Sequence, residues 1–323
     1  MNKFLFAKLF AIGCLSLVPR LAIADFPDRA IHIVVPYSAG GSTDIAARIV
    51  AESLTKQIGA AVIIENRPGA SGFIGAGLVA RAKPDGYTLL FAGNGIATAP
   101  SVKEVTFDIR KDLTPISRIV ASQFSILVNP KLPVNTLQEL LAYAKANPGK
   151  LNFACSGAMT AAHFALEGFR QAAGLDFVTI QFAGNAPAVA AMLAGEPLAG
   201  IDAAFSAKGA VSSGMLRALA VTGAKRSPLL PDVPTASEAG VPGYVGGFSL
   251  VMLAPGGTPK TVVDKIYQAI VASLKDQAVM SQLEGQGMEP VGNSPEEYGV
   301  QLETEIQQSA KIIDSLKASG VVK

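Results

Sequence analysis

The chain has 323 residues, 50% of them hydrophobic, and a formal net charge of +2 at pH 7. A chain of this length can bury the cores of two lobes, and its 2 cysteines exclude a disulfide-rich scaffold. Lysine and arginine form no basic tract, so we expect neither a nucleic-acid partner nor a membrane-surface partner.

The first 24 residues have the pattern of an export signal. Two lysines precede an apolar run over 9–18, which is too short to span a bilayer, and small residues around Ala24 are typical of a cleavage site. We therefore predict a signal peptide over 1–24, cleaved near Ala24, and a periplasmic location. Attachment of a lipid at Cys14 is the less favoured alternative.

Cleavage would remove three of the 27 basic residues and no acidic ones, so that 24 basic residues remain against 25 acidic ones, a formal net charge of −1. Cys155 would then be the single cysteine, which excludes an intramolecular disulfide. One cysteine and 2 histidines make no metal-ligand cluster, so we expect neither a metal nor another cofactor.

The stretch over 31–44 predicts a buried strand, a small-residue turn and the start of a helix. A helix begins with backbone N–H groups that lack partners inside the helix, and its dipole adds partial positive charge there. Gly40 and Gly41 would let a carboxylate approach this backbone, while Ser38, Ser42 or Thr43 could add a hydroxyl donor. The alternative is an ordinary turn in which Ser42 caps the helix.

Two further strands are predicted over 61–65 and 87–92, with a glycine-spaced helix over 73–82 between them. Those glycines do not fit the dinucleotide-binding pattern, so we attribute them to close helix packing. Ligands of open α/β sheets lie beyond the carboxyl ends of the strands. Asn94, which follows the strand over 87–92, is therefore a candidate ligand contact.

A second lobe is predicted from the alternation of strands and helices that follows. Strands are expected over 120–128, 151–155, 176–181, 200–205, 216–222 and 248–254. Helices are expected over 136–146 behind a capping box, after Thr160, over 186–193, after Thr258–Pro259 and over 294–316. The turn over 155–160 again joins a short strand to a helix through small polar residues, as the first turn does. Two such anion sites suggest a ligand held from both sides. Asp202 is either a ligand contact or a solvent-facing edge residue.

The strands near 120–128 and 248–254 would connect the lobes and form a hinge. Lobe 1 is then expected over 25–122 and 253–323, and lobe 2 over 123–252.

Several motifs resemble one known family in their order and spacing over essentially the whole mature chain. They are Phe26–Ile31 leading into Val35–Asp44, Asn66–Ala70, Lys83–Leu90, Leu151–Ala154 through His163, Leu216–Thr222 and Leu230–Thr235. Each motif is weak alone, but together they are similar to the substrate-binding proteins of tripartite tricarboxylate transporters, the Bug or TctC family.

The resemblance implies a type II periplasmic-binding-protein fold, in which two α/β lobes close over a small carboxylate and deliver it to membrane permease subunits. It implies one carboxylate-binding loop over 37–44, acting largely through backbone N–H groups and ordered water, and another over 155–160. We expect a monomer. The candidate ligand contacts are Tyr37, Ser38, Ala39, Gly40, Gly41, Asp44, Asn94, Cys155, Ser156, Thr160, Gly184, Asn185 and Asp202.

The chain departs from the family pattern in its second lobe. Family members commonly carry a serine at Cys155, a glycine or small polar residue near Met159 and a tyrosine-lysine pair at Phe182–Ala183. They also often have an acid at Ala191 and a tryptophan near Phe248. Loss of the hydroxyl and the cation at 182–183 makes a more apolar or aromatic carboxylate plausible.

Two other functions compete with transport. A hydrolase would use Cys155 as nucleophile and His163 as base, but no third catalytic group is indicated, and an ordinary thiol is mostly protonated at neutral pH. A sensor would present its closed lobes to a membrane histidine kinase. Closure is common to sensing and transport, so the sequence leaves this alternative open.

Overall fold

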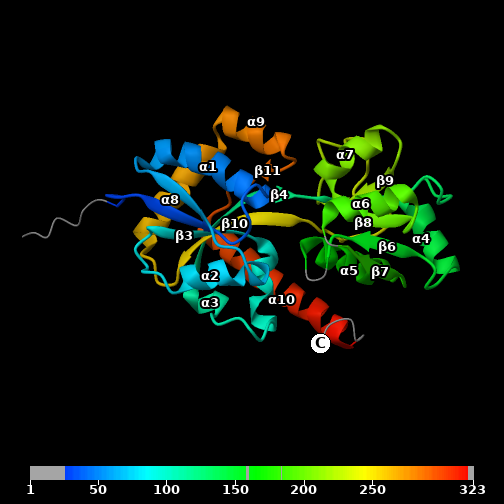
Figure 1. Cartoon of the computed structure of the whole chain (residues 1–323), viewed down its shortest axis with the longest axis horizontal. Coiled ribbons are helices and arrows are strands. Elements are labelled where there is room, and N and C mark those ends of the chain that lie inside the picture. Colours follow the sequence, from blue (N-terminus) through cyan, green and yellow to red (C-terminus); the bar gives the residue numbers. More distant parts are fainter. Residues whose placement is uncertain (1–25, 158–159, 183, 319–323) are drawn as a thin grey trace, which may run out of the picture.

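The computed structural model describes residues 26–157, 160–182 and 184–318. Within this part the chain forms two α/β lobes that lie side by side along the long axis of the molecule (Figure 1). The predicted two-lobed α/β fold is confirmed. The predicted signal peptide, Cys14, Met159 and Ala183 lie outside the described residues. No described helix combines the length and the apolar character that a membrane span requires.

Lobe 1 is built on a six-stranded mixed sheet of order β11-β4-β10-β3-β1-β2. Its strands are β1 (Ile31–Val35), β2 (Val62–Asn66), β3 (Thr88–Gly93), β4 (Leu113–Ser122), β10 (Phe248–Pro255) and β11 (Glu289–Pro290). Its helical segments are α1 (Ser42–Ile58), η1 (Ala70–Gly72), α2 (Phe73–Ala80), η2 (Asn94–Ser101), α3 (Ile109–Asp112), α8 (Lys260–Leu274), α9 (Gln277–Gly285) and α10 (Pro295–Ala318).

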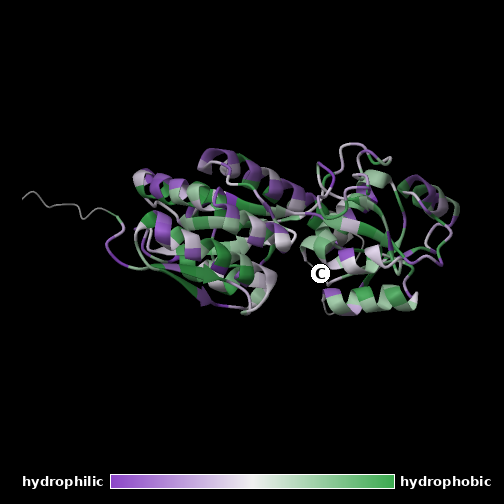
Figure 2. Ribbon diagram, turned by 90° about the horizontal axis from the view of Figure 1, so that it is seen from above, coloured by the Kyte–Doolittle hydropathy of each residue, from purple (hydrophilic) through white to green (hydrophobic). Residues whose placement is uncertain are grey.

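Alternation along β1 explains how the lobe 1 sheet is covered on both faces. Ile31, Ile33 and Val35 pack in one core with α1, α8 and α9, whereas Val34 packs in a second core with α2, η2 and α10. Because both faces are covered, the strand is apolar at every position but one. Figure 2 shows the same arrangement, with hydrophobic strands inside and hydrophilic residues on the outer helices.

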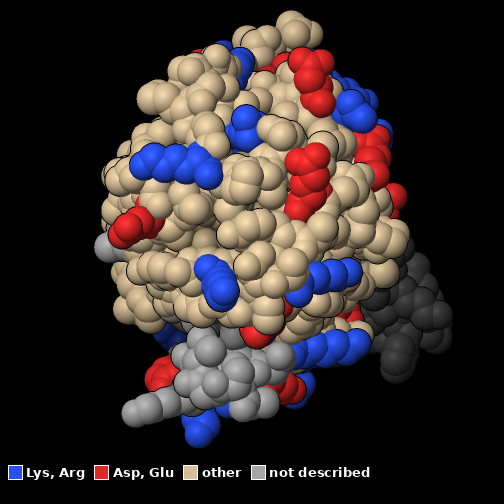
Figure 3. All heavy atoms as spheres, turned by 90° about the vertical axis from the view of Figure 1, so that its right-hand side faces the viewer, with Lys and Arg blue, Asp and Glu red and all other residues tan. Residues whose placement is uncertain are grey.

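Lobe 2 is built on a five-stranded sheet of order β7-β6-β8-β5-β9. Its strands are β5 (Phe124–Val128), β6 (Asn152–Cys155), β7 (Val178–Gln181), β8 (Ala199–Ala203) and β9 (Arg217–Val221). Its helices are α4 (Leu137–Ala146), α5 (Ala161–Ala173), α6 (Asn185–Ala194) and α7 (Ala204–Ser212). Helices α4 and α5 pack on one face of the sheet and α6 and α7 on the other. On the face of the molecule in Figure 3, acidic and basic side chains are interspersed.

The described chain passes between the lobes twice, before β5 and before β10. Strand β10 pairs along its whole length with β4 and over four residues with β3, so residues 248–252 belong to lobe 1 and not to lobe 2 as predicted. The two passages touch, because a Cβ atom added to Gly247 would lie 2.5 Å from the carbonyl oxygen of Ser122. The two connecting backbones are thus adjacent at the place where the sequence predicts a hinge.

Several helices differ from the prediction. Ala204 and Phe205 begin α7, although the apolar run over 200–205 predicts a continuous strand. Helix α9 is absent from the prediction; it has nine residues and is separated from the end of α8 by only two residues. Pro259, and not Thr258, occupies the N-cap position of α8, and the hydroxyl of Thr258 donates to the carbonyl of Pro255 at 2.7 Å.

Candidate functional site

A cleft of about 1100 Å³ lies between the lobes and is lined by residues of both. Lobe 1 contributes the start of α1, the region of η1, the end of β3, η2 with the loop after it, and the last turns of α10. Lobe 2 contributes the starts of α5, α6 and α7. Tyr37, Ser42 and Thr43 of the first predicted anion-binding turn (37–44) and Ser156 and Thr160 of the second (155–160) therefore line one cavity.

The first turn presents an uncapped helix start to the cleft. Gly41 is the N-cap of α1 with φ −75° and ψ 165°, and no side chain accepts a hydrogen bond at this cap. Ser42 and Thr43 are the first helical residues and both line the cleft. Ser42 is thus not the cap, so the alternative of an ordinary capped turn does not hold. The backbone N–H groups that begin α1 remain as donors toward a ligand.

Asp44 was predicted to contact the ligand, but it does not line the cleft and instead holds the turn in place through hydrogen bonds. Its buried carboxylate accepts hydrogen bonds from the backbone N–H of Gly40 at 2.8 Å, from Arg48 at 3.0 Å and from Asn66 at 2.9 Å. Burial acts to raise the pKa of this carboxyl, but these hydrogen bonds outweigh it and lower the pKa to about 2. Neither Asp44 nor Gly40 lines the cleft, and the Gly40 N–H is already used.

Tyr37 lines the cleft at the other end of this turn. Burial raises the pKa of its hydroxyl, against the opposing effect of a backbone hydrogen bond from Gly93, so the group stays neutral. Ser38, Ala39 and Gly41 are exposed turn residues outside the cleft lining. They connect Tyr37 to Ser42. Within this turn only Gly40, with φ 81°, adopts the left-handed conformation that favours glycine.

In lobe 2, the start of α5 borders the cleft through Ser156, Thr160 and Ala161. The hydroxyl of Thr160 caps the helix by accepting a hydrogen bond from the N–H of His163 at 3.2 Å and donates to the carbonyl of Gly157 at 2.9 Å. The cap fixes the direction of α5, whose positive dipole end therefore faces the cleft.

Asn185 begins α6 and lines the cleft, with Gly184 as the N-cap before it. Its amide donates to the carboxylate of Asp202 at 2.7 Å, and the hydroxyl of Ser206 also donates to that carboxylate. Asp202 is 2% exposed, and burial raises its pKa. Because β8 lies inside the sheet, Asp202 is neither an edge residue nor a lining residue; it orients Asn185.

Asn94 follows β3 and lines the cleft, as the position of the strand end predicted. Its side-chain carbonyl accepts a hydrogen bond from the backbone N–H of Ser249 at 3.2 Å, and its side chain also interacts with half-buried Glu305. These contacts hold Asn94 at the junction of β3 and β10, next to the hinge.

Sequence reasoning missed most of the apolar and charged lining. The missed residues are Ala70, Ser71, Phe73, Gly93, Gly95, Thr98, Ser101, Val102, Lys103, Glu104, Val105, Phe124, Ala161, Ala162, Ala203, Phe205, Phe248, Leu250, Ile313 and Lys317. Two of the phenylalanines could have been predicted from the sequence, because Phe124 and Phe248 lie in the two predicted hinge strands, which border the cleft. Their rings are 5.9 Å apart and form part of the cleft wall at the hinge.

Cys155 and His163 do not form a nucleophile and base at the cleft. Both side chains are fully buried, and Cys155 packs in the core between β6 and α5. Burial raises the pKa of the Cys155 thiol to about 11 and lowers the pKa of His163, whose Nε2 lies 3.9 Å from the carboxylate of Glu167. Neither residue lines the cleft. Among the described residues no group of three or more His, Cys, Asp and Glu side chains is placed to hold a metal ion.

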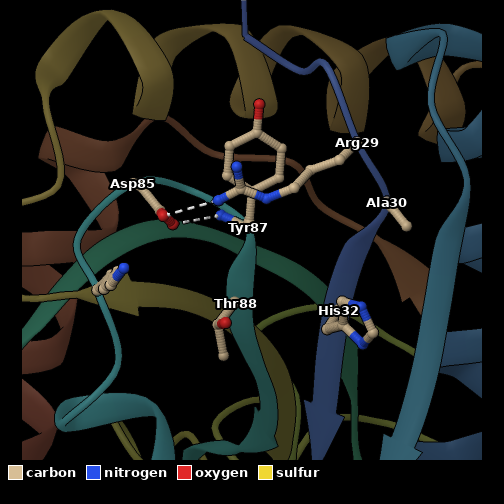
Figure 4. A pocket seen from close by; sticks show the side chains of 7 residues that line it. Arg29, Ala30, His32, Asp85, Tyr87 and Thr88 are labelled. Atoms are coloured by element: carbon tan, nitrogen blue, oxygen red, sulfur yellow. Dashed lines mark hydrogen bonds and ion pairs between the residues drawn. The ribbon is translucent and has the colours of Figure 1, made fainter.

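A second hollow, of about 420 Å³, lies at the amino-terminal ends of β1 and β3, the opposite end from the cleft. Figure 4 shows Arg29 over the ring of Tyr87, with its guanidinium 3.7 Å from the ring centroid and 3.0 Å from Asp85. Here the arginine is paired with an acid and covers an aromatic face. The hollow therefore offers a ligand fewer open donors than the cleft does.

Two α/β lobes, two connecting passages and a cleft lined by helix starts define the class of solute-binding proteins. The chain belongs to the TctC family, described as tripartite tricarboxylate transporter family receptor, whose model matches residues 46–318. The predicted family is confirmed. This is a family of periplasmic solute-binding receptors.

Three similar proteins illustrate the family. Protein BugT of Bordetella pertussis is 33% identical over 308 residues, which cover 94% of this chain and 94% of BugT. The structure of R. palustris Rpa4515 with adipate is 33% identical, has a TM-score of 0.75 and covers 92% of this chain and 99% of that one. The structure of MatC from Rhodopseudomonas palustris with bound malate is 29% identical, has a TM-score of 0.72 and covers 89% of this chain and 100% of that one.

Proposed function

We propose that this protein captures a small carboxylate in the cleft between its lobes and delivers it to a tripartite tricarboxylate-type transporter in the membrane. The observation that carries the proposal is that α1 of lobe 1 and α5 of lobe 2 both begin at the same cleft. Each helix start offers partial positive charge and open N–H groups, which suit a carboxylate. Export through residues 1–24 and action as a monomer belong to the same proposal.

The polar lining near the helix starts consists of neutral hydrogen-bond donors and acceptors. The hydroxyls of Ser42, Thr43 and Ser156 and the amide of Asn185 lie there, together with the N–H groups of α1 and α5. A carboxylate accepts several such bonds at once. Four phenylalanines, Phe73, Phe124, Phe205 and Phe248, supply an apolar wall. This combination favours an organic carboxylate over a sugar or an inorganic anion.

The similar structures support this substrate class. One holds adipate and another holds malate, and both resemble this chain over most of its length. Adipate has an apolar chain between its carboxylates and malate has a hydroxyl, so the two fit different linings. The aromatic wall of this cleft favours the more apolar kind of ligand.

A thermal-shift screen at pH 7 tests the proposal. Ligands that bind only the folded protein raise its melting temperature by mass action. We expect at least one member of a panel of aliphatic and aromatic mono- and dicarboxylates to raise the Tm, and neutral sugars to leave it unchanged. A shift with sugars and with no carboxylate would contradict the proposal.

Gly41→Val tests the location of the site. The φ of Gly41 is −75°, and an added Cβ would meet only the carbonyl of Ser38 at 3.5 Å, so the variant should fold. A branched side chain at the N-cap would crowd the donors of Ser42 and Thr43, and we expect calorimetry to show at least about a tenfold loss of affinity. Gly285→Val, at the end of α9 where an added Cβ meets nothing within 4 Å, is the control. Unchanged affinity in Gly41→Val would place the ligand elsewhere.

Deletion of the gene tests the delivery step. Uptake of the carboxylate by the deleted strain should fall, and expression of the intact gene should restore it. Normal uptake together with a lost transcriptional response to the carboxylate would support the sensor alternative and exclude transport.

A further inference from the structure

Charged side chains are few in the lining of the cleft. Among the described lining residues only Lys103, Glu104 and Lys317 carry charge, which sums to one net positive charge. Lys103 and Glu104 lie in the loop after η2, and Lys317 lies in the last turn of α10. Within the described chain neither lysine forms an ion pair or a hydrogen bond, and because Glu104 offsets one of the two lysines, one net positive charge remains in the lining.

Helix α10 carries Lys317 from lobe 1 to the cleft. Its first turns pack on η2 and β4 in lobe 1, with Tyr298 and Leu302 buried in the lobe 1 core. It then continues beyond that core and contacts α5 of lobe 2, and Ile313 and Lys317 line the cleft there. In Figure 1 this red helix leaves lobe 1 and runs toward lobe 2. A 24-residue helix holds the position of a terminal lysine better than a loop does.

The helix starts alone do not account for these lysines. The start of a helix is equivalent to roughly half a positive charge, and the hydroxyls beside it are neutral, so one carboxylate is well served by them. A monocarboxylate held there would leave two ammonium groups facing the cleft without a partner. A second carboxylate on the same ligand would give them one, and the phenylalanine wall suits the carbon chain that separates the two groups.

We infer that Lys317, together with Lys103, makes this protein select dianionic dicarboxylates over monocarboxylates. This inference rests on the proposed function, and it assigns the two ends of the ligand to different groups. One carboxylate binds at the start of α1 or α5, and the other faces the lysines of α10 and of the loop after η2. The charge of a lysine near a partly solvated cleft acts over several ångströms, so direct contact is not required.

Calorimetry with matched ligand pairs tests the inference. The pairs are succinate and butyrate, adipate and hexanoate, and terephthalate and benzoate, each with the same carbon skeleton or nearly so. We expect the wild-type protein to bind the dicarboxylate of its best pair at least about tenfold more tightly than the monocarboxylate. The Lys103→Met/Lys317→Met variant should lose most of that preference through weaker dicarboxylate binding, because Met keeps the apolar stem without the charge.

Lys83→Met is the matched control, because Lys83 lines the hollow at the opposite end of the lobe 1 sheet. The preference of the Lys83→Met variant for dicarboxylates over monocarboxylates should equal that of the wild type. The preference of the wild type should also fall between 20 and 300 mM salt, roughly as screening predicts, while that of the double variant changes less. An unchanged preference in the double variant, or a wild-type protein that binds both members of every pair equally, would overturn the inference and leave the proposed function standing. Failure to bind any carboxylate would overturn both.

Discussion

At the scale of single residues, Asp44 is the group on which the shape of the anion-binding turn depends. It ties the turn, through the N–H of Gly40, to Arg48 one helical turn further and to Asn66 at the end of β2. The same contact removes Gly40 from the donors available to a ligand. The backbone donors that remain belong to the start of α1, so the carboxylate should lie one or two residues further along the chain than the glycines suggest.

We expect Asp44→Asn to lower the free energy of unfolding at pH 7 by about 2 kcal/mol, since a buried charged acceptor of three hydrogen bonds is lost. The pKa of Asp44 is lowered from 3.8 to about 2 in the folded protein, so its contribution is present above pH 4 and is lost as the pH falls toward 2. Urea unfolding at pH 7 and pH 3 measures both effects, and the variant should show the smaller pH dependence.

Glu52→Gln is the control for this prediction. Glu52 lies on the same helix, but it is exposed and forms only a surface ion pair with Lys56 at 3.5 Å. Its loss should change stability little at either pH. Equal effects of the two substitutions would show that the hydrogen bonds of Asp44 do not hold the turn.

Cys155 gives a second test at this scale. Its thiol is 0% exposed, and burial raises its pKa to about 11, so it should stay protonated and shielded at pH 8. In the mature chain we expect Ellman's reagent to react with Cys155 only after unfolding in guanidinium. Rapid modification of the folded protein would contradict the buried position and revive the nucleophile interpretation.

At the scale of elements, the starts of α1 and α5 are the parts that are expected to act on the ligand. Thr160→Ala removes the cap of α5 and should cost about 1 kcal/mol of stability. It should also weaken carboxylate binding severalfold, because the helix start at the cleft becomes less ordered. The measurements are urea unfolding and calorimetry with the carboxylate found in the thermal screen.

Thr136→Ala separates these two effects. Thr136 caps α4 in the same way, accepting from the N–H of Glu139 at 3.2 Å, and α4 does not line the cleft. A similar loss of stability with unchanged affinity is expected. Equal loss of affinity in both variants would mean that the effect of Thr160→Ala comes from general destabilisation.

Local sequence patterns predicted the strands and helices that form the site. They failed where contacts between distant parts of the chain determine the structure. The strand, turn and helix over 31–58 follow from apolar alternation, two glycines and helical spacing, all within one stretch. Helix α7 was missed because its first residues, Ala204 and Phe205, are apolar and follow β8 directly, so they look like a continuation of that strand. No local pattern shows that the carboxylate of Asp44 turns back to Gly40, or that Asp202 lies behind Asn185.

The charged lining was the least predictable part of the site. Lys317 reaches the cleft only because α10 packs along lobe 1 and then extends past it to α5. Lys103 lies in a loop whose path depends on η2, which the sequence does not indicate. From the sequence alone both residues look like ordinary surface lysines, and only the arrangement of the lobes shows that they line the cleft.

At the scale of the whole molecule, the proposed capture of a carboxylate requires two lobes that close on one ligand. The two passages between them lie in contact at Ser122 and Gly247, so closure needs dihedral changes in only a few residues of two adjacent backbones. Gln123, between β4 and β5, accepts a hydrogen bond from the N–H of Gly223 at 3.1 Å and donates to Glu289 at 3.3 Å. It links both lobes at the axis about which they would move.

A crystal structure of the protein with the carboxylate from the thermal screen would show whether the two helix starts hold the ligand. We expect closed lobes, with carboxylate oxygens about 2.7–3.2 Å from backbone nitrogens at the start of α1 and further contacts at the start of α5. A carboxylate bound in the hollow beside Arg29 and Tyr87, or held in the cleft away from both helix starts, would contradict this expectation.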